Sequence, residues 1–172
     1  MMSQVLNASK KINTNIGNQP NILSYPYGES SLRVEKVIKE LGIEAAFSQH
    51  SSPLSNYDFI YRLPRFALND EYGEIKRFKM ILNTQRLPIN SSTYKDTVVN
   101  QGELGLEFES DFKVQDINCF INEGAILNKQ DSDKSFFLKI SNLKVKTRHR
   151  LNCTLIKNND VYWYGKIIKR IN

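Results

Sequence analysis

The sequence has few of the residues that build ready-made catalytic or metal centres. Its 172 residues include two histidines, two cysteines and one tryptophan. His50 and His149 lie far apart, and neither His-x-x-x-His nor His-Glu-x-x-His occurs, so no local zinc motif is present. Gly-x-Ser-x-Gly elbows and Gly-rich phosphate loops are also missing. These absences exclude the usual metalloprotease, serine-hydrolase and nucleotide-binding signatures.

Long hydrophobic runs are missing as well. No apolar stretch approaches the roughly 18 residues that cross a bilayer, so we predict no transmembrane segment. The opening residues lack a basic segment followed by an apolar one, and we expect no secretory signal there. With 40% hydrophobic and 24% charged residues, the composition is that of a globular protein, and it leaves the localisation open.

Positive charge is concentrated near the end of the sequence. The net charge is +6, and residues 141–172 carry eight Lys or Arg and a single acidic residue, Asp160. Cations alternate with other residues in Leu143–Arg148, which places them on one face of a strand. This face is either simply solvated or contacts an acidic glycan or envelope surface. We predict no nucleic-acid partner, because no zinc-finger, helix-turn-helix or RNA-platform motif accompanies the charge.

The two cysteines have a spacing that is wrong for a zinc knuckle. Cys119 and Cys153 are 34 residues apart, and each lies in a strand-like run. Zinc knuckles use closely spaced Cys pairs. The two residues are therefore either two buried thiols or one disulfide that joins two strands, and the pattern alone leaves both interpretations open.

The first half of the chain alternates helical and strand patterns. Helical spacing of apolar residues predicts a helix over 5–16, and a second helix over 31–41 has Ser30 as its cap, Leu32 facing inward and Gly42 after its end. Short strands are predicted at 22–24 and 43–47. This order is typical of a parallel α/β sheet or barrel. Because a complete barrel needs about 250 residues, we expect this part to be the end of a larger barrel.

The second half has the pattern of a β domain. Five strands are predicted at 104–108, 117–121, 135–140, 151–156 and 161–168. Polar runs at 128–133 and 157–160 are predicted to separate them. The predicted fold class is therefore α/β plus β: a partial (β/α) barrel over residues 1–90, followed by a small antiparallel β-sandwich over residues 91–172.

The segment Ser24–Glu29, Ser-Tyr-Pro-Tyr-Gly-Glu, is the main candidate for a site. It follows a strand and precedes a helix, which in a parallel barrel places it at the face where sites are built. Pro26 fixes the turn and Gly28 permits close backbone approach. Tyr25 and Tyr27 offer flat rings suited to sugars, and a packed turn with ordinary aromatic residues is the alternative.

Several segments together resemble one enzyme family. Ile22–Glu29, Leu41–Gln49 and Leu63–Phe66 resemble the later part of a polysaccharide deacetylase of the NodB-homology family, in the branch whose third motif reads Tyr-Pro-Tyr-Gly. The small β domain that follows some of these deacetylases is similar to the region with Leu104–Phe108, Cys119, Arg150–Thr154 and Tyr162–Tyr164. The resemblance covers roughly residues 5 to 168.

The resemblance implies a zinc-dependent hydrolase that removes acetyl groups from N-acetylated sugars of the cell envelope or extracellular matrix. Its metal, which polarises the amide and activates water, is held by an aspartate and a His-x-x-x-His pair, with a further aspartate as base. None of these has a counterpart in this sequence. We therefore assign no metal ligand or cofactor to the chain, and expect it to be inactive by itself.

Only the later motifs of the family have counterparts among these residues. By resemblance, Tyr27 supplies a backbone N–H to the oxyanion, and Tyr25, Pro26, Tyr27 and Gly28 form the substrate wall. Arg65 is the candidate for orienting the base, with a structural salt bridge as the alternative. Members of the family are usually periplasmic or extracellular. If the family's small domain pairs Cys119 with Cys153, a full-length relative of this chain is expected outside the cytoplasm as well.

The predicted function is thus that of a polysaccharide deacetylase-like protein whose ligand is an N-acetylated polysaccharide. The missing N-terminal half of the barrel is a second expected partner. Two alternatives stay open: a non-catalytic carbohydrate-binding or interaction module, and one half of a split deacetylase.

Overall fold

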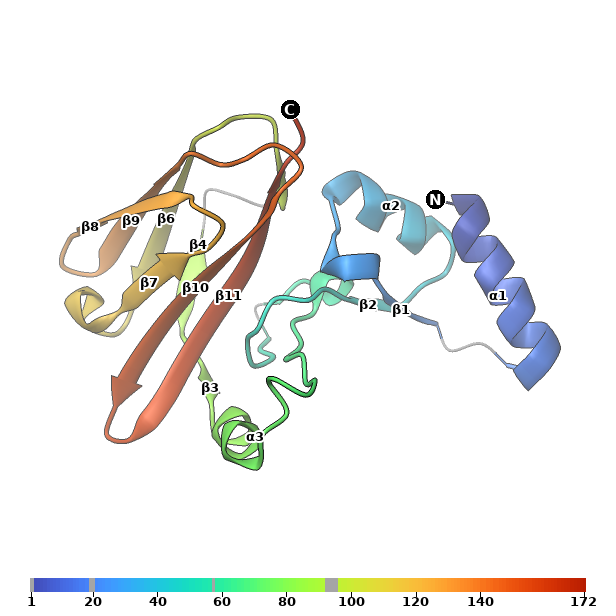
Figure 1. Cartoon of the computed structure of the whole chain (residues 1–172), viewed down its shortest axis with the longest axis horizontal. Coiled ribbons are helices and arrows are strands. Elements are labelled where there is room, and N and C mark those ends of the chain that lie inside the picture. The colour runs from blue at the N-terminus through green and yellow to red at the C-terminus, as the bar shows by residue number, and fades with distance from the viewer. Residues whose placement is uncertain (1, 19–20, 57, 92–95) are drawn as a thin grey trace.

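The protein has an α/β part and a β-sandwich that lie side by side (Figure 1). The computed structural model describes residues 2–18, 21–56, 58–91 and 96–172. Among the described helices, none is both long enough and apolar enough to span a membrane. The order of elements agrees with the predicted class, α/β plus β.

The α/β part contains a small parallel sheet and two helices. Helix α1 spans Met2–Ile16, strand β1 spans Ile22–Ser24, helix α2 spans Leu32–Glu40 and strand β2 spans Ala45–Phe47. Strands β1 and β2 pair in parallel, and an isolated bridge joins Phe47 to Leu63. In the described residues this sheet has two strands and does not close into a barrel.

Helix α2 begins one residue later than predicted. The side chain of Ser31, rather than that of Ser30, accepts a hydrogen bond from the Val34 N–H at 3.2 Å. Ser30 is instead buried, and its carbonyl accepts a hydrogen bond from Thr97. Leu32 was expected to face inward but is the first residue of α2 and is 49% exposed. Gly42, at φ 78°, follows the helix as predicted.

The β-sandwich consists of two sheets. The four-stranded sheet has the order β4 (Ile89–Ser91), β6 (Leu104–Ser110), β9 (Ser135–Ser141) and β8 (Ile126–Asp131). The other has the order β3 (Gln85–Arg86), β11 (Asp160–Arg170), β10 (Arg148–Lys157) and β7 (Asn118–Ile121), with β5 (Val98–Val99) also on β11. Helix α3 (Ile75–Leu82) and the 3₁₀ turns Pro26–Gly28, Ile60–Arg62 and Val114–Asp116 complete the elements.

The sandwich differs from the prediction in two respects. The polar run that begins at Asn128 was predicted as a break, but residues 126–131 form β8. This strand pairs only with β9 in the described sheet, and such an edge position accepts polar side chains. Strands β3 and β5 run parallel to β11, so the sandwich is not purely antiparallel. The predicted division at residue 90 falls inside β4 and stays a prediction.

The inner faces of the two sheets form the main core. Phe108 is fully buried, stacks on Phe136 with ring centroids 5.1 Å apart, and meets the edge of Tyr164 at 5.5 Å. Cys119 of β7 and Cys153 of β10 are direct partners in the ladder and form a disulfide. The structure thus resolves the question that the cysteine spacing left open.

The segment after β2 joins the two parts of the protein. Ser52 Oγ donates a hydrogen bond to the Trp163 carbonyl of β11 at 3.2 Å, and the Phe66 and Trp163 rings meet edge to face at 5.5 Å. The backbone of Ser51 lies so close to Gly165 that a Cβ at Gly165 would be 2.2 Å from the Ser51 oxygen. The α/β part therefore packs directly on β11.

The stacked position of Phe108 yields a stability prediction. We expect Phe108→Ala to lower the free energy of unfolding by about 3–5 kcal/mol, because it leaves a cavity between the sheets. Phe120→Ala, at a side chain that is 54% exposed, is the matched control and should change it by less than about 1 kcal/mol. Urea denaturation of both variants measures the difference, and equal effects would contradict the assigned core.

Candidate functional site

The loop after β1 has an unusual backbone. Tyr27, a non-glycine residue, lies in the left-handed region at φ 56°, and Gly28 follows at φ 70°. The Tyr25 N–H donates to the Phe47 carbonyl at 3.0 Å and the Gly28 N–H donates to the Tyr25 carbonyl at 2.9 Å. A bulky residue at positive φ is strained by roughly 1–2 kcal/mol, so the surrounding contacts must hold this turn.

Tyr25 holds the start of the turn from the interior. Its side chain is 3% exposed and packs with Ile38 and Ala46 in the core of the α/β part. Its hydroxyl donates to the Tyr61 carbonyl at 2.9 Å, and burial raises the pKa of this phenol. Tyr25 therefore positions the loop, while the exposed surface of the loop is left to Pro26 and Tyr27.

Gly28 and Arg65 hold the turn from the side of β2. A Cβ on Gly28 would lie 2.3 Å from the Gln49 backbone nitrogen, so only glycine fits this approach. The Ser48 hydroxyl donates to the Gly28 carbonyl at 2.7 Å, and Arg65 Nε donates to the Ser48 carbonyl at 2.8 Å. Arg65 is thus connected to the loop through Ser48, and its predicted role in orienting a base stays a prediction.

Tyr27 is the part of the loop that is open to a ligand. Its side chain is 76% exposed. Among the described residues, nothing accepts a hydrogen bond from its N–H, and its carbonyl accepts one from Arg148 Nη1 of β10. The same nitrogen of Arg148 donates to Gln49 Oε1 at 3.3 Å. The Tyr27 carbonyl is therefore held by Arg148, while the N–H of Tyr27 stays free among the described residues.

The sandwich contributes residues to this site that could not be assigned to it from sequence patterns. Lys169 of β11 forms an ion pair with Glu29, the residue after the loop, and Arg148 reaches Tyr27. Both cations belong to the basic end of the chain, where the alternation of charges predicts a strand face. The sequence shows that this end of the chain is basic, but it does not show which distant segment the basic residues contact.

A group of buried charges lies under the junction of the two parts. Arg86 pairs with Asp58 at 3.0 Å and stacks over the Tyr164 ring at 4.6 Å, and Arg62 pairs with Glu35. Burial is the main cause that lowers the pKa of His50 to about 3, and the nearby cations Arg86, Arg62 and Lys166 contribute to the same shift. Such a histidine is neutral at physiological pH, since its cationic form is both desolvated and repelled.

The residues described do not fit a zinc centre. They contain no group of three or more His, Cys, Asp or Glu side chains placed to hold a metal ion. His149, which lies on a strand predicted to expose its charges, is fully buried. Its Nε2 accepts from the Lys144 N–H at 3.0 Å and its Nδ1 lies 3.1 Å from the Asn122 carbonyl. Both ring nitrogens are used structurally, so neither is available as a ligand.

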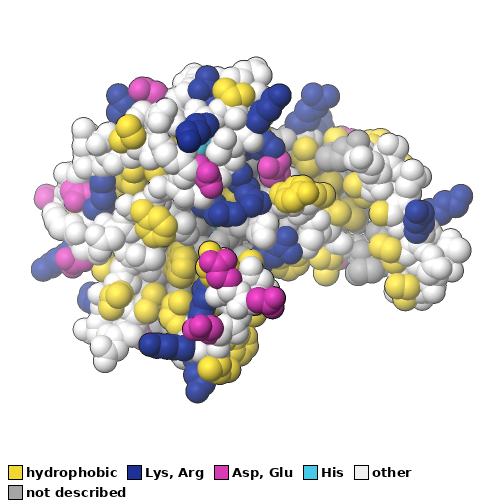
Figure 2. All heavy atoms as spheres, in the orientation of Figure 1, with side chains coloured by type: hydrophobic (Ala, Val, Ile, Leu, Met, Phe, Trp, Pro, Cys, Tyr) yellow, Lys and Arg dark blue, Asp and Glu magenta, His cyan; other side chains and the backbone are white. Residues whose placement is uncertain are grey.

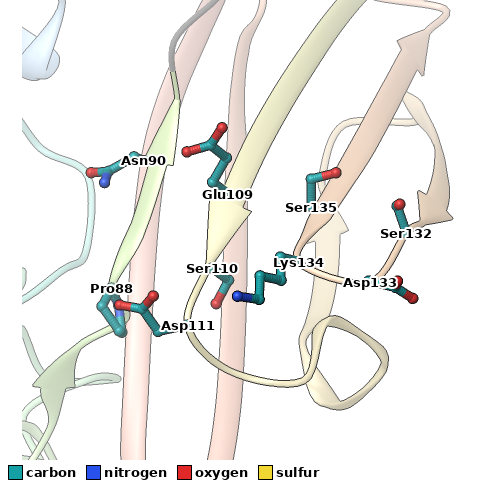
Figure 3. A pocket seen from close by; sticks show the side chains of 9 residues that line it. All are labelled: Pro88, Asn90, Glu109, Ser110, Asp111, Ser132, Asp133, Lys134 and Ser135. Atoms are coloured by element: carbon teal, nitrogen blue, oxygen red, sulfur yellow. The ribbon is translucent and has the colours of Figure 1, made fainter.

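A pocket lies on the sandwich, and Tyr27 is not among its lining residues. It encloses about 620 Å³, within the size range of small-ligand pockets. Its lining is polar and has no aromatic ring, and it comes from β4, β6 and the turn between β8 and β9 (Figure 3). The lining residues are Pro88, Asn90, Glu109, Ser110, Asp111, Ser132, Asp133, Lys134 and Ser135.

Comparisons with known proteins add no relative to this picture. No protein-family model matches the chain, and no curated protein matches it significantly.

The close approach at Gly28 can be tested by substitution. We expect Gly28→Ala to lower the free energy of unfolding by about 2–4 kcal/mol, because it combines a left-handed backbone with a clash against Gln49. Gly42→Ala is the matched control: its φ is 78° and nothing lies within 4 Å of its Cβ position, so only the backbone cost of about 1 kcal/mol applies. Chemical denaturation measures both values, and equal losses would disprove the clash.

The burial of His50 predicts a pH dependence. Its pKa is about 3 in the folded protein and about 6.5 in the unfolded chain, so the unfolded state binds the extra proton between these values. Stability is fully present above pH 6.5 and falls as the pH drops toward 3. The unmodified protein should lose stability between pH 7 and pH 4.5. In His50→Gln this decrease in the free energy of unfolding should be smaller by on the order of 2 kcal/mol. Urea titrations at several pH values test this, and parallel profiles would contradict it.

Proposed function

We propose that this chain forms the substrate wall of a polysaccharide deacetylase-like site and binds N-acetylated polysaccharide. The observation that carries the proposal is the free N–H of Tyr27 on an exposed, strained turn that follows a parallel strand. A backbone donor held in this way suits an amide oxygen of the N-acetyl group. It suits even better the oxyanion that forms when such an amide is attacked.

Preorganisation is the physical basis of this role. Strained backbone conformations persist where the surrounding structure holds them, and they concentrate at ligand sites. Tyr25, Gly28 and Arg148 fix three sides of the turn. The donor therefore keeps its direction before the ligand arrives, and the binding of the carbonyl oxygen does not have to supply the ordering of the loop.

The Tyr27 ring provides the second contact. Its ring is largely exposed beside the free N–H, and an aromatic face of this kind packs on the C–H surface of a sugar ring. In the proposed complex the ring holds the sugar while the N–H takes the acetyl oxygen. Both contacts come from one residue, so they select a sugar that carries its acetamido group near the stacked ring.

Deacetylation needs more than this wall. In the family that the sequence resembles, zinc supplies the polarised carbonyl and the activated water, and the described residues do not fit such a centre. The proposal therefore assigns binding and orientation of the acetyl group to this chain. Hydrolysis at this site requires metal ligands from elsewhere.

The second candidate function is that of one half of a split deacetylase. It is favoured by strand β1, which pairs only with β2 in the described sheet and leaves its outer edge without a neighbouring strand. Ile22 on this strand is exposed. Unpaired edges of this kind accept a strand from another polypeptide, and a partner strand there would extend the sheet beside the Tyr27 turn.

The disulfide supports an extracytoplasmic setting for either function. Cys153 is fully buried and is joined to Cys119 across adjacent strands. Disulfides of this structural kind persist in oxidising compartments, which is where envelope polysaccharides lie.

The proposed contacts can be observed one by one in solution. We expect the backbone amide resonance of Tyr27 to shift on addition of an N-acetylglucosamine oligomer and to stay in place with the de-N-acetylated oligomer. In Tyr27→Gly the glycine tolerates the positive φ, and the aromatic ring is removed. Because the ring contact with the sugar is lost, binding should weaken about tenfold, the equivalent of about 1.4 kcal/mol.

Tyr72→Gly, at another exposed tyrosine outside the loop, serves as the control and should bind like the unmodified chain. If the Tyr27 amide responds to neither oligomer, or to both equally, the proposed recognition of the acetyl group is wrong.

A further inference from the structure

We propose that the polysaccharide recognised at the Tyr27 turn is anionic, and that cations of β10 and β11 bind its acidic groups. This inference rests on the proposed function, since it names the class of glycan that the same site takes. The cationic strip is defined as Arg148, Arg150 and Lys169, with Lys144 and Lys146 on the segment that leads into β10.

The strand register places the strip beside the turn. Arg148 and Arg150 are two residues apart on β10, so their side chains project from the same face of the sheet. Lys169 of β11 is the direct ladder partner of Arg148. Arg148 contacts the Tyr27 carbonyl, so the strip begins at the residue that carries the free donor. Figure 2 shows Lys and Arg side chains, with some Asp and Glu among them, where the sandwich meets the α/β part.

The cationic side chains of the strip outnumber the carboxylates near them. Glu29 is paired with Lys169, and among the described residues neither Arg148 nor Arg150 takes part in a salt bridge. Burial and, to a lesser degree, the neighbouring Arg150 lower the pKa of Arg148, while Glu29 and Glu123 act in the opposite direction. The two guanidinium groups therefore repel each other, and a bound anion would relieve this repulsion.

Arginine is well suited to this task. Its planar guanidinium binds a carboxylate, sulfate or phosphate through two parallel hydrogen bonds. Arg148 uses one nitrogen for the Tyr27 carbonyl and Gln49, and Arg150 is exposed, so donors of both side chains are left for a ligand. A sugar stacked on Tyr27 would place the acidic group of an adjoining residue over these donors.

Calorimetric titration with two oligosaccharides of equal length tests the inference. One alternates N-acetylglucosamine with glucuronate, and the other is neutral N-acetylglucosamine oligomer. We expect the acidic oligosaccharide to bind at least tenfold more tightly in 50 mM salt, and this preference to shrink in 500 mM salt because exposed charges are screened. Arg150→Gln should reduce the preference about fivefold or more and leave binding of the neutral oligomer unchanged.

Lys113→Gln removes one exposed cation outside the strip and should leave the preference intact. Equal affinities for the two oligosaccharides would overturn the inference and leave the proposed function standing. Binding of neither would reject the proposed function itself. A single-stranded oligonucleotide that competes as well as the acidic oligosaccharide would show a general polyanion surface, and would also overturn the inference.

Discussion

The close contact between the segment after β2 and strand β11 is the constraint on which the rest of the structure depends. Gly165 lets the backbone at Ser51 approach β11 more closely than any side chain would allow. Ser52 then reaches the Trp163 carbonyl. This contact sets the distance between the α/β part and the sandwich, and so determines that Arg148 of β10 meets the carbonyl of Tyr27.

Buried charge reinforces the same junction. Arg86 and Asp58 connect the segment after β2 to the strands of the sandwich, and Arg62 pairs with Glu35 of α2 within the α/β part. Ion pairs with little exposure contribute modest net stability, but the loss of one partner leaves a costly unpaired charge. These pairs therefore specify one arrangement of the two parts, and they keep neutral His50 in an environment that disfavours its protonation.

The proposed site follows from that arrangement. A tyrosine at positive φ is unfavourable by itself, and it is kept in place by buried Tyr25 on one side and by Arg148 on the other. Tyr25 belongs to the loop itself, whereas Arg148 lies on a strand more than a hundred residues later. The same cations that fix the turn give its surroundings a positive charge, which links the proposed recognition of an acetyl group to the proposed preference for acidic glycans.

The sequence by itself determined the local elements, because their signals are short-range. Helical spacing and Gly42 fixed α2 to within a residue at each end, and alternation of apolar residues identified the long strands of the sandwich. The motif that contains Pro26 and Gly28 was recognisable as a turn. Strand β8 was missed, because polar side chains on an edge strand leave no apolar alternation to read.

Only the tertiary structure decided how these elements meet. Ladder register placed Cys119 opposite Cys153 and Arg148 beside Lys169, and neither pairing is encoded in spacing along the chain. It also buried Tyr25 and left Tyr27 exposed with a free N–H. Two tyrosines with equal sequence signals thus have different roles, because burial and hydrogen bonding depend on contacts between residues that are distant in sequence.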